Sequence, residues 1–296
     1  LAFLDHPLLR ELSVQAPGTW NHSMVMGQMA EAAAEAIGAN PLLVRVGAYY
    51  HDIGKTKKPG YFIENQGGKE NKHDKLTPSM SALIVKAHVK DGAEMARDHR
   101  IPEALIDFIM QHHGTSLIQF FYDKAIEQAG EGGTVEENLY RYPGPKPQTR
   151  ESGIMMLADA VEASCRTLSD PSPAKIQGLV QKMINKIFIS GELEESNLTL
   201  KDMHHIAKCF TRVLSGIHHR RVEYSESAEK GKEYKSEDKS DKKGTDLLKQ
   251  IEQQEAKKNG NQHSDSKSST KPTKEASDNK KQDQKSSKDA IKRLGI

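Results

Sequence analysis

Apolar residues recur at spacings of three and four through most of the first 225 residues, and this spacing constrains the fold more than any other feature. Side chains at such spacings share one face of an α-helix, whereas a half-buried strand would need strict alternation. Glycines and prolines, such as Gly38 and Pro41, separate the periodic segments. The pattern predicts an all-α helical bundle, and no internal repeat is visible.

The predicted helices cover residues 22–38, 41–55, 78–99, 102–114, 117–129, 151–168, 173–191 and 199–221. Thr77 is expected to cap one of them, and Thr199 with Asp202 resembles a capping box. Residues 56–76 are rich in glycine and polar side chains and are expected to form a long loop. Long loops inside compact domains are often functional.

The composition changes after residue 225. Lys, Glu, Asp, Ser, Gln and Asn then follow one another, with isolated apolar residues such as Leu247 and Ile251. Such a segment cannot bury enough apolar surface to offset the backbone entropy lost on folding, about 1 to 2 kcal/mol per residue. We therefore predict one folded domain over residues 1–225 and a disordered charged tail over residues 226–296.

Charge and cysteine content exclude several classes of protein. The chain has 43 Lys and Arg against 41 Asp and Glu, a net charge of +2, which does not favour a nucleic-acid partner. Cys165 and Cys209 are its two cysteines and form no CxxC motif, which argues against a disulfide framework and indicates a reducing compartment. No run of about 18 apolar residues occurs. The chain begins at Leu1, so we expect it to be part of a longer protein, which leaves a membrane-bound segment open.

Histidine and aspartate residues stand among apolar residues at five separate places in the predicted helices. They are His22, His51, Asp52, His88, His112, His113 and Asp159. A single such histidine is usually a hydrogen-bonded core residue, but burying this many imidazoles and carboxylates is costly unless they are paired or bind metal.

Facing helices of a bundle can bring such side chains to one site. Imidazole and carboxylate without thiolate suit Fe, Mn, Zn or Co. The set exceeds one tetrahedral site, and Asp52 could bridge two ions, so the sequence predicts a two-metal site of the kind that hydrolyses phosphate esters.

Lys55 lies three residues after Asp52 and therefore on the same side of a helix. A cation there would neutralise a phosphate oxygen as negative charge develops on it. The alternative is an exposed lysine at a helix end. Other candidates are discounted as surface, structural or polar-segment residues: His6, His73, His99, His204, His205, His218, His219, His263, Glu31 and Glu35.

The order His22, His-Asp at 51 and 52, His88, the pair at 112 and 113, and Asp159 resembles the HD-domain metal-dependent phosphohydrolases. The stretches HDIGK, GYFIENQ, QHHGTSLIQFFY and PGPKPQTRES look more narrowly like the cytoplasmic domain of the seven-transmembrane-receptor HD family, which includes cyclic di-AMP phosphodiesterases. This resemblance covers about residues 1–225 and implies that they form an HD-type metallophosphohydrolase domain.

The resemblance implies a site with two divalent transition-metal ions, iron or manganese. His22, His51 and Asp159 would hold one ion, His88, His112 and His113 the other, and Asp52 would bridge them. A hydroxide bridging the metals would attack phosphorus and convert cyclic di-AMP to linear pApA. Lys55 would contact the scissile phosphate, and further nucleotide contacts would come from Tyr61, Asn71, Leu76, Arg166 and Thr167.

Several alternatives stay open. The related cyclic di-GMP enzymes carry Gly-Tyr-Pro after the paired histidines, whereas this chain has HHGTSLIQFFY, which argues against that substrate. The domain could instead bind a cyclic dinucleotide without turnover, or act on another nucleotide such as cyclic di-GMP or a guanosine polyphosphate. The resemblance also implies a cytoplasmic location in a membrane-anchored protein and leaves a homodimer open.

Overall fold

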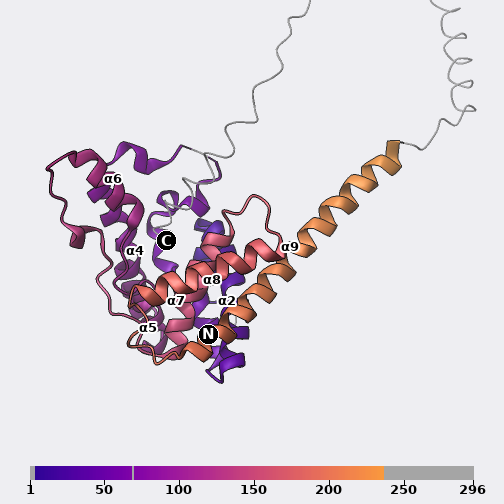
Figure 1. Ribbon diagram of the computed structural model, residues 1–296, viewed down its shortest axis with the longest axis horizontal. Coiled ribbons are helices and arrows are strands. Elements are labelled where there is room, and N and C mark those ends of the chain that lie inside the picture. The colour runs from indigo at the N-terminus through magenta and orange to yellow at the C-terminus, as the bar shows by residue number, and fades with distance from the viewer. Residues whose placement is uncertain (1–3, 69, 237–296) are drawn as a thin grey trace, which may run out of the picture. The chain divides into compact units, whose positions relative to one another are not determined.

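The computed structural model describes residues 4–68 and 70–236, and within them it contains helices and no strand (Figure 1). This confirms the predicted all-α fold class. The α-helices are α1 (Pro7–Gln15), α2 (Pro17–Ile37), α3 (Pro41–Tyr50), α4 (Pro78–Asp98), α5 (Glu103–Gln111), α6 (Gln119–Ala129), α7 (Arg150–Cys165), α8 (Pro173–Ile189) and α9 (Leu200–Ser236). The short 3-10 helices are η1 (Ile53–Lys57), η2 (Pro59–Tyr61), η3 (Ile63–Asn65), η4 (Lys72–Lys75) and η5 (Glu137–Tyr140).

Local sequence signals account for many of the helix ends. Proline occupies the first turn of α1, α2, α3, α4 and α8, where its missing N–H costs no intrahelical hydrogen bond. The Thr77 hydroxyl accepts a hydrogen bond from the backbone N–H of Met80, as predicted. Thr199 and Asp202 exchange side chain–backbone hydrogen bonds, which confirms the predicted capping box.

Two helices end before the metal-ligand candidates that the sequence pattern placed inside them. Helix α3 ends at Tyr50, so His51 and Asp52 stand at the junction with η1 rather than inside a helix. Helix α5 ends at Gln111, and His112 and His113 follow it. Asp52, with φ −112° and ψ 15°, leaves the α-helical conformation, and the chain tightens into a 3-10 turn. Helix α1 was not predicted, and the expected loop 56–76 contains three short 3-10 helices.

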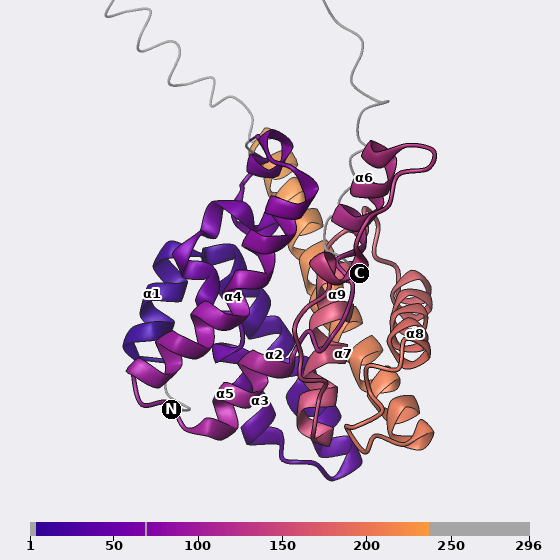
Figure 2. The same cartoon turned by 90° about the vertical axis from the view of Figure 1, so that its left-hand side faces the viewer.

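The core is built where α2 packs along α3 and α7, and where α5 packs on α3 and α4. In the view of Figure 2, α1 lies on the left and α8 on the right, with α2, α5 and α7 between them. The buried side chains at these contacts are apolar, for example Met26, Met29, Ile109, Ile154 and Leu157. This packing holds the ends of α3 and α5 close to the middle of α2, α4 and α7.

Helix α9 belongs to two compact units of the chain. Its first part lies in the unit that contains α1 to α8, and residues 219–236 continue the helix in the second unit. The predicted disordered tail thus begins inside α9, and residues 237–296 lie outside the described residues. Among the described helices, none is both long and apolar enough to span a membrane.

Candidate metal centre

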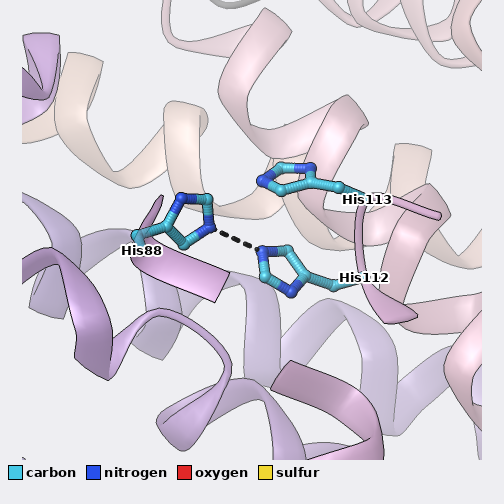
Figure 3. A group of neighbouring side chains, drawn as sticks. All are labelled: His88, His112 and His113. Atoms are coloured by element: carbon cyan, nitrogen blue, oxygen red, sulfur yellow. Dashed lines mark hydrogen bonds between the residues drawn. The ribbon is translucent and has the colours of Figure 1, made fainter. Parts of the chain in front are cut away.

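Helices α2, α4 and α7 and the ends of α3 and α5 bring together all the histidines and aspartates predicted as metal ligands. Their potential ligand atoms form three groups, each with its atoms within 4.8 Å of one another: His22, His51 and Asp159; His88, His112 and His113; His51, Asp52 and His112. Figure 3 shows the second group, in which the Nε2 atoms of His88 and His112 are 3.2 Å apart. The first two groups contain the same residues as the two predicted metal sites.

Asp52 lies between the groups and is 1% exposed. Its Oδ1 is 3.4 Å from His88 Nε2 and 3.7 Å from His112 Nε2. Its Oδ2 is 3.1 Å from His51 Nε2. One carboxylate oxygen therefore faces each side of the centre, which is the arrangement that a bridging ligand requires.

Hydrogen bonds at the outer ring nitrogens orient three of the histidines. The Nδ1 atoms of His51, His88 and His112 lie 2.7, 2.6 and 2.8 Å from the carbonyl oxygens of Ala48, Val85 and Ile109. Because a carbonyl can only accept, each Nδ1 carries the proton and each Nε2 keeps its lone pair. This is how metal-binding imidazoles are held in proteins.

Buried polar atoms without partners also fit a metal. Among the described residues, His51 Nε2 and Asp52 Oδ1 are buried and have no hydrogen-bond partner. Leaving such atoms unpaired costs free energy, and buried polar groups are almost always satisfied. The donor set of imidazole and carboxylate suits a divalent transition metal. The residues therefore fit the ions that the sequence predicts.

Burial sets the protonation of the second group. It lowers the pKa of His112 to about 3 and also lowers the pKa of His88 and of His113. These imidazoles are therefore neutral at pH 7, as metal ligands must be. Burial opposes ionisation of Asp52, but the adjacent His51 imidazole and the charge of Lys55 outweigh it and hold the pKa of this carboxyl well below its usual range.

Lys55 is not an exposed lysine at a helix end: 14% of its side chain is exposed, and its ammonium belongs to an ion-pair network. Its Nζ lies 2.8 Å from Asp52 Oδ2 and 2.9 Å from Glu64 Oε1. Burial alone would lower the pKa of this ammonium, but the two carboxylates raise it above its ordinary value. Lys55 is thus a fixed positive charge beside the metal centre.

A cavity of about 400 Å³ opens over the centre, a volume within the usual range of small-molecule sites. Four of the predicted substrate contacts line it: Lys55, Tyr61, Asn71 and Arg166. Leu76 and Thr167 are not among the described residues that line it, so their contact with a nucleotide stays a prediction. The Asn71 Oδ1 accepts hydrogen bonds from His73 N and Gln66 Nε2, so this side chain also holds the loop together.

The sequence analysis missed several residues around the centre. Tyr142 stacks on His113 with ring centroids 4.2 Å apart, and Glu192 accepts hydrogen bonds from the N–H and hydroxyl of Thr115. Glu162 contacts His22, and its position three residues after Asp159 on one helix was the signal that could have revealed it. Tyr142 and Glu192 lie in a loop and a turn, and Glu64 lies in the short 3-10 helix η3. No spacing rule places these residues at the centre.

The discounted histidines need one correction. His73 is 5% exposed and lines the cavity, so its polar sequence context was misleading. Its Nε2 lies 2.9 Å from the carbonyl oxygen of Tyr61, which fixes the loop over the centre.

Other discounted residues lie apart from the three ligand groups. His204 is exposed, and Glu31 forms an ion pair with Arg45. His218 Nε2 lies 3.6 Å from Cys165 Sγ. The side chains of His219 and His263 lie outside the described part of the chain.

Known proteins resemble this chain in both sequence and structure. The sequence profile of the HD domain matches residues 19–164. A crystal structure of the HD domain of the phosphodiesterase PgpH from L. monocytogenes, in complex with cyclic-di-AMP, matches with a TM-score of 0.69 and 46% identity. The match covers 72% of this chain and 98% of that chain. The chain therefore belongs to the HD-domain family.

Within that family the chain is similar to two curated proteins named cyclic-di-AMP phosphodiesterase PgpH. It is 49% identical over 228 residues to the protein of Bacillus subtilis and 46% identical over 224 residues to that of Listeria monocytogenes. These alignments cover 77% and 76% of this chain but 32% and 31% of the relatives. The chain thus spans about a third of the length of the relatives that it matches.

Proposed function

We propose that this domain is a metal-dependent phosphodiesterase that hydrolyses cyclic di-AMP to linear pApA. The observation that carries the proposal is the convergence of the two ligand groups on Asp52, beside a cavity that could admit a nucleotide. The substrate assignment is supported by the two relatives named cyclic-di-AMP phosphodiesterase and by the related HD domain solved with cyclic-di-AMP.

The proposed cofactors are two divalent ions, iron or manganese. His22, His51 and Asp159 would hold one ion, His88, His112 and His113 the other, and Asp52 would contact both. Ions bound there would supply Lewis acidity, which makes water a stronger nucleophile at neutral pH and withdraws charge from the phosphoryl oxygens.

Lys55 is the residue best arranged to bind the scissile phosphate. An ammonium has three N–H donors, and Asp52 and Glu64 accept two of them. The third is available to a phosphate oxygen in the cavity, which Lys55 lines. The Lys55 Nζ also lies 5.0 Å from the centre of the Phe62 ring, which further restricts its position. The charge is thus in place before the substrate arrives, and such preorganised charge stabilises a transition state efficiently.

Residues farther from the ions would hold the nucleotide. We assign this role to Tyr61, Asn71 and Arg166, which line the cavity. The resemblance assigns it also to Leu76 and Thr167, which are not among the lining residues. Lys72 Nζ lies 5.2 Å from the centre of the Tyr61 ring, a distance compatible with a cation–π contact that limits the movement of the ring.

The proposal is tested with purified protein loaded with Mn²⁺ or Fe²⁺. We expect conversion of cyclic di-AMP to pApA, a lower rate with cyclic di-GMP and with a guanosine polyphosphate, and no turnover after chelation. Binding of cyclic di-AMP without turnover under any metal condition would support a binding module instead. Faster hydrolysis of a guanine nucleotide would overturn the substrate assignment.

The setting of this activity is part of the proposal. We propose that the domain is the cytoplasmic part of a longer, membrane-anchored protein. The support is its resemblance to that class and its match to about a third of the curated relatives. Cys165 and Cys209 are both free, as expected in a reducing compartment.

A further inference from the structure

Glu162 is a buried carboxylate beside the proposed metal centre that the mechanism above does not use. It lies on α7, one turn after Asp159, and is 4% exposed. Its Oε2 is in short contact with His22 Nδ1 and lies 3.2 Å from Arg166 Nε. One carboxylate oxygen thus joins a predicted metal ligand to a predicted substrate contact.

His22 differs from the three histidines that are held by backbone carbonyls. Its Nδ1 faces Glu162, and its Nε2 lies 3.0 Å from Asp159 Oδ1. Both carboxylates come from the same side of α7, since residues three apart on a helix are neighbours. The ring is therefore fixed at both nitrogens by one helix.

We propose that Glu162 is a positioning residue that fixes the His22 ring, so that Nε2 binds the ion held with His51 and Asp159, and that also anchors Arg166 at the cavity. The inference rests on the proposed function, because it assumes that this group binds a metal. When Glu162 Oε2 accepts a hydrogen bond from the Nδ1–H of His22, Nε2 is the ring atom left to bind the ion. Partners of this kind raise the basicity of the ligand, and their loss typically costs ten- to hundredfold in metal affinity.

The inference predicts that a change at Glu162 affects only one of the two metal sites. Glu162 contacts His22 and Arg166. By contrast, backbone carbonyls orient His88 and His112, and the Tyr142 ring stacks on His113. Loss of the Glu162 charge should weaken one metal site and leave the other nearly unchanged. It should also release Arg166 and raise the KM for the substrate more than it lowers kcat at saturating metal.

The test compares Glu162→Gln with a control on the same helix, Glu151→Gln. Glu151 accepts a hydrogen bond from the backbone N–H of Asn40 and belongs to none of the ligand groups. Mn²⁺ binding is followed by calorimetry and by electron paramagnetic resonance. We expect two ions in the wild type and in the control, and in Glu162→Gln one ion at wild-type affinity and one bound ten- to hundredfold more weakly. Glu162→Asp should recover part of the loss.

The outcomes separate the inference from the function on which it rests. If Glu162→Gln binds both ions as tightly as the wild type, the positioning role is wrong and the proposed function stands. The same conclusion follows if the affinities of both sites fall equally. If the wild type binds no metal, the proposed function itself fails.

A measurement on the wild type covers the case in which the variant does not fold. In ¹⁵N spectra of the zinc-loaded protein, His22 should carry its proton on Nδ1. A proton on Nε2 would overturn the inference.

Discussion

At the scale of single residues, the ion pairs of Lys55 with Asp52 and Glu64 support its proposed role in binding the phosphate. Replacement of Lys55 by Met removes the charge that we propose binds the phosphate and leaves the proposed ligands of both ions in place. We expect kcat to fall roughly 10²- to 10³-fold, as on loss of one preorganised donor to a developing charge. Mn²⁺ stoichiometry, measured on the same sample, should stay at two.

The matched control for this prediction is Lys57→Met, since Lys57 is exposed in the same 3-10 helix. Its activity should equal that of the wild type. Equal kcat values for both variants would show that Lys55 does not act on the substrate.

A second prediction at this scale concerns pH. Burial lowers the pKa of His112 to about 3, whereas the ordinary value is 6.5. Below pH 6.5 the unfolded chain binds a proton at His112 that the folded chain does not, so stability falls as pH falls from 6.5 towards 3. For one histidine with this lowered pKa, the free energy of unfolding falls by about 2 kcal/mol between pH 7 and pH 5.

This dependence is measured by urea unfolding of the metal-free protein at the two pH values. Between pH 7 and pH 5 the free energy of unfolding of the wild type should fall by about 2 kcal/mol more than that of His112→Asn. Each protein gives one loss in free energy of unfolding between pH 7 and pH 5. Subtracting the loss of His112→Asn from that of the wild type cancels the contribution of groups that both proteins share, including His22. Equal losses would contradict a neutral, buried His112.

At the scale of elements, the turn from α3 into η1 decides where Asp52 lies. Gly54 makes this turn fit against α4, because a Cβ atom there would lie 2.0 Å from the carbonyl oxygen of His88. We expect Gly54→Ala to destabilise the protein by about 1 to 3 kcal/mol, as overpacking of a core does. It should also weaken metal binding, because the added Cβ atom pushes η1 away from α4 and so separates Asp52 from His88.

Gly178→Ala is the control, because a Cβ atom at this position within α8 meets nothing within 4 Å. Its free energy of unfolding should be unchanged or higher by up to about 1 kcal/mol. Chemical denaturation measures both variants. A Gly54→Ala protein as stable as Gly178→Ala would contradict the close packing of η1 on α4.

The elements also show which parts of the site were predictable. His22, His88 and Asp159 were found because polar residues within apolar helical patterns need a partner. The ends of α3 at Tyr50 and of α5 at Gln111 were not foreseen, because the apolar spacing continues past them. His73 was discounted on its polar neighbours, although the fold of its loop buries it. Contacts across loops depend on the tertiary path, which local spacing does not encode.

At the scale of the whole molecule, the charged C-terminal segment is predicted to contribute nothing to the site. A chain that ends at Ser236, the last residue of α9, should retain the thermal midpoint, the metal content and the turnover of the complete chain. Thermal unfolding and activity of the two proteins test this. A lower midpoint or a lost ion in the shorter protein would show that the segment supports the domain.

The central claim is that Asp52 joins two ions held by separate groups of histidines. Anomalous diffraction from crystals of the manganese-loaded protein tests this claim most directly. The account predicts two peaks about 3.5 to 4 Å apart on either side of the Asp52 carboxylate, the separation of two-metal hydrolytic sites. A single peak, or two peaks that Asp52 does not contact, would contradict it.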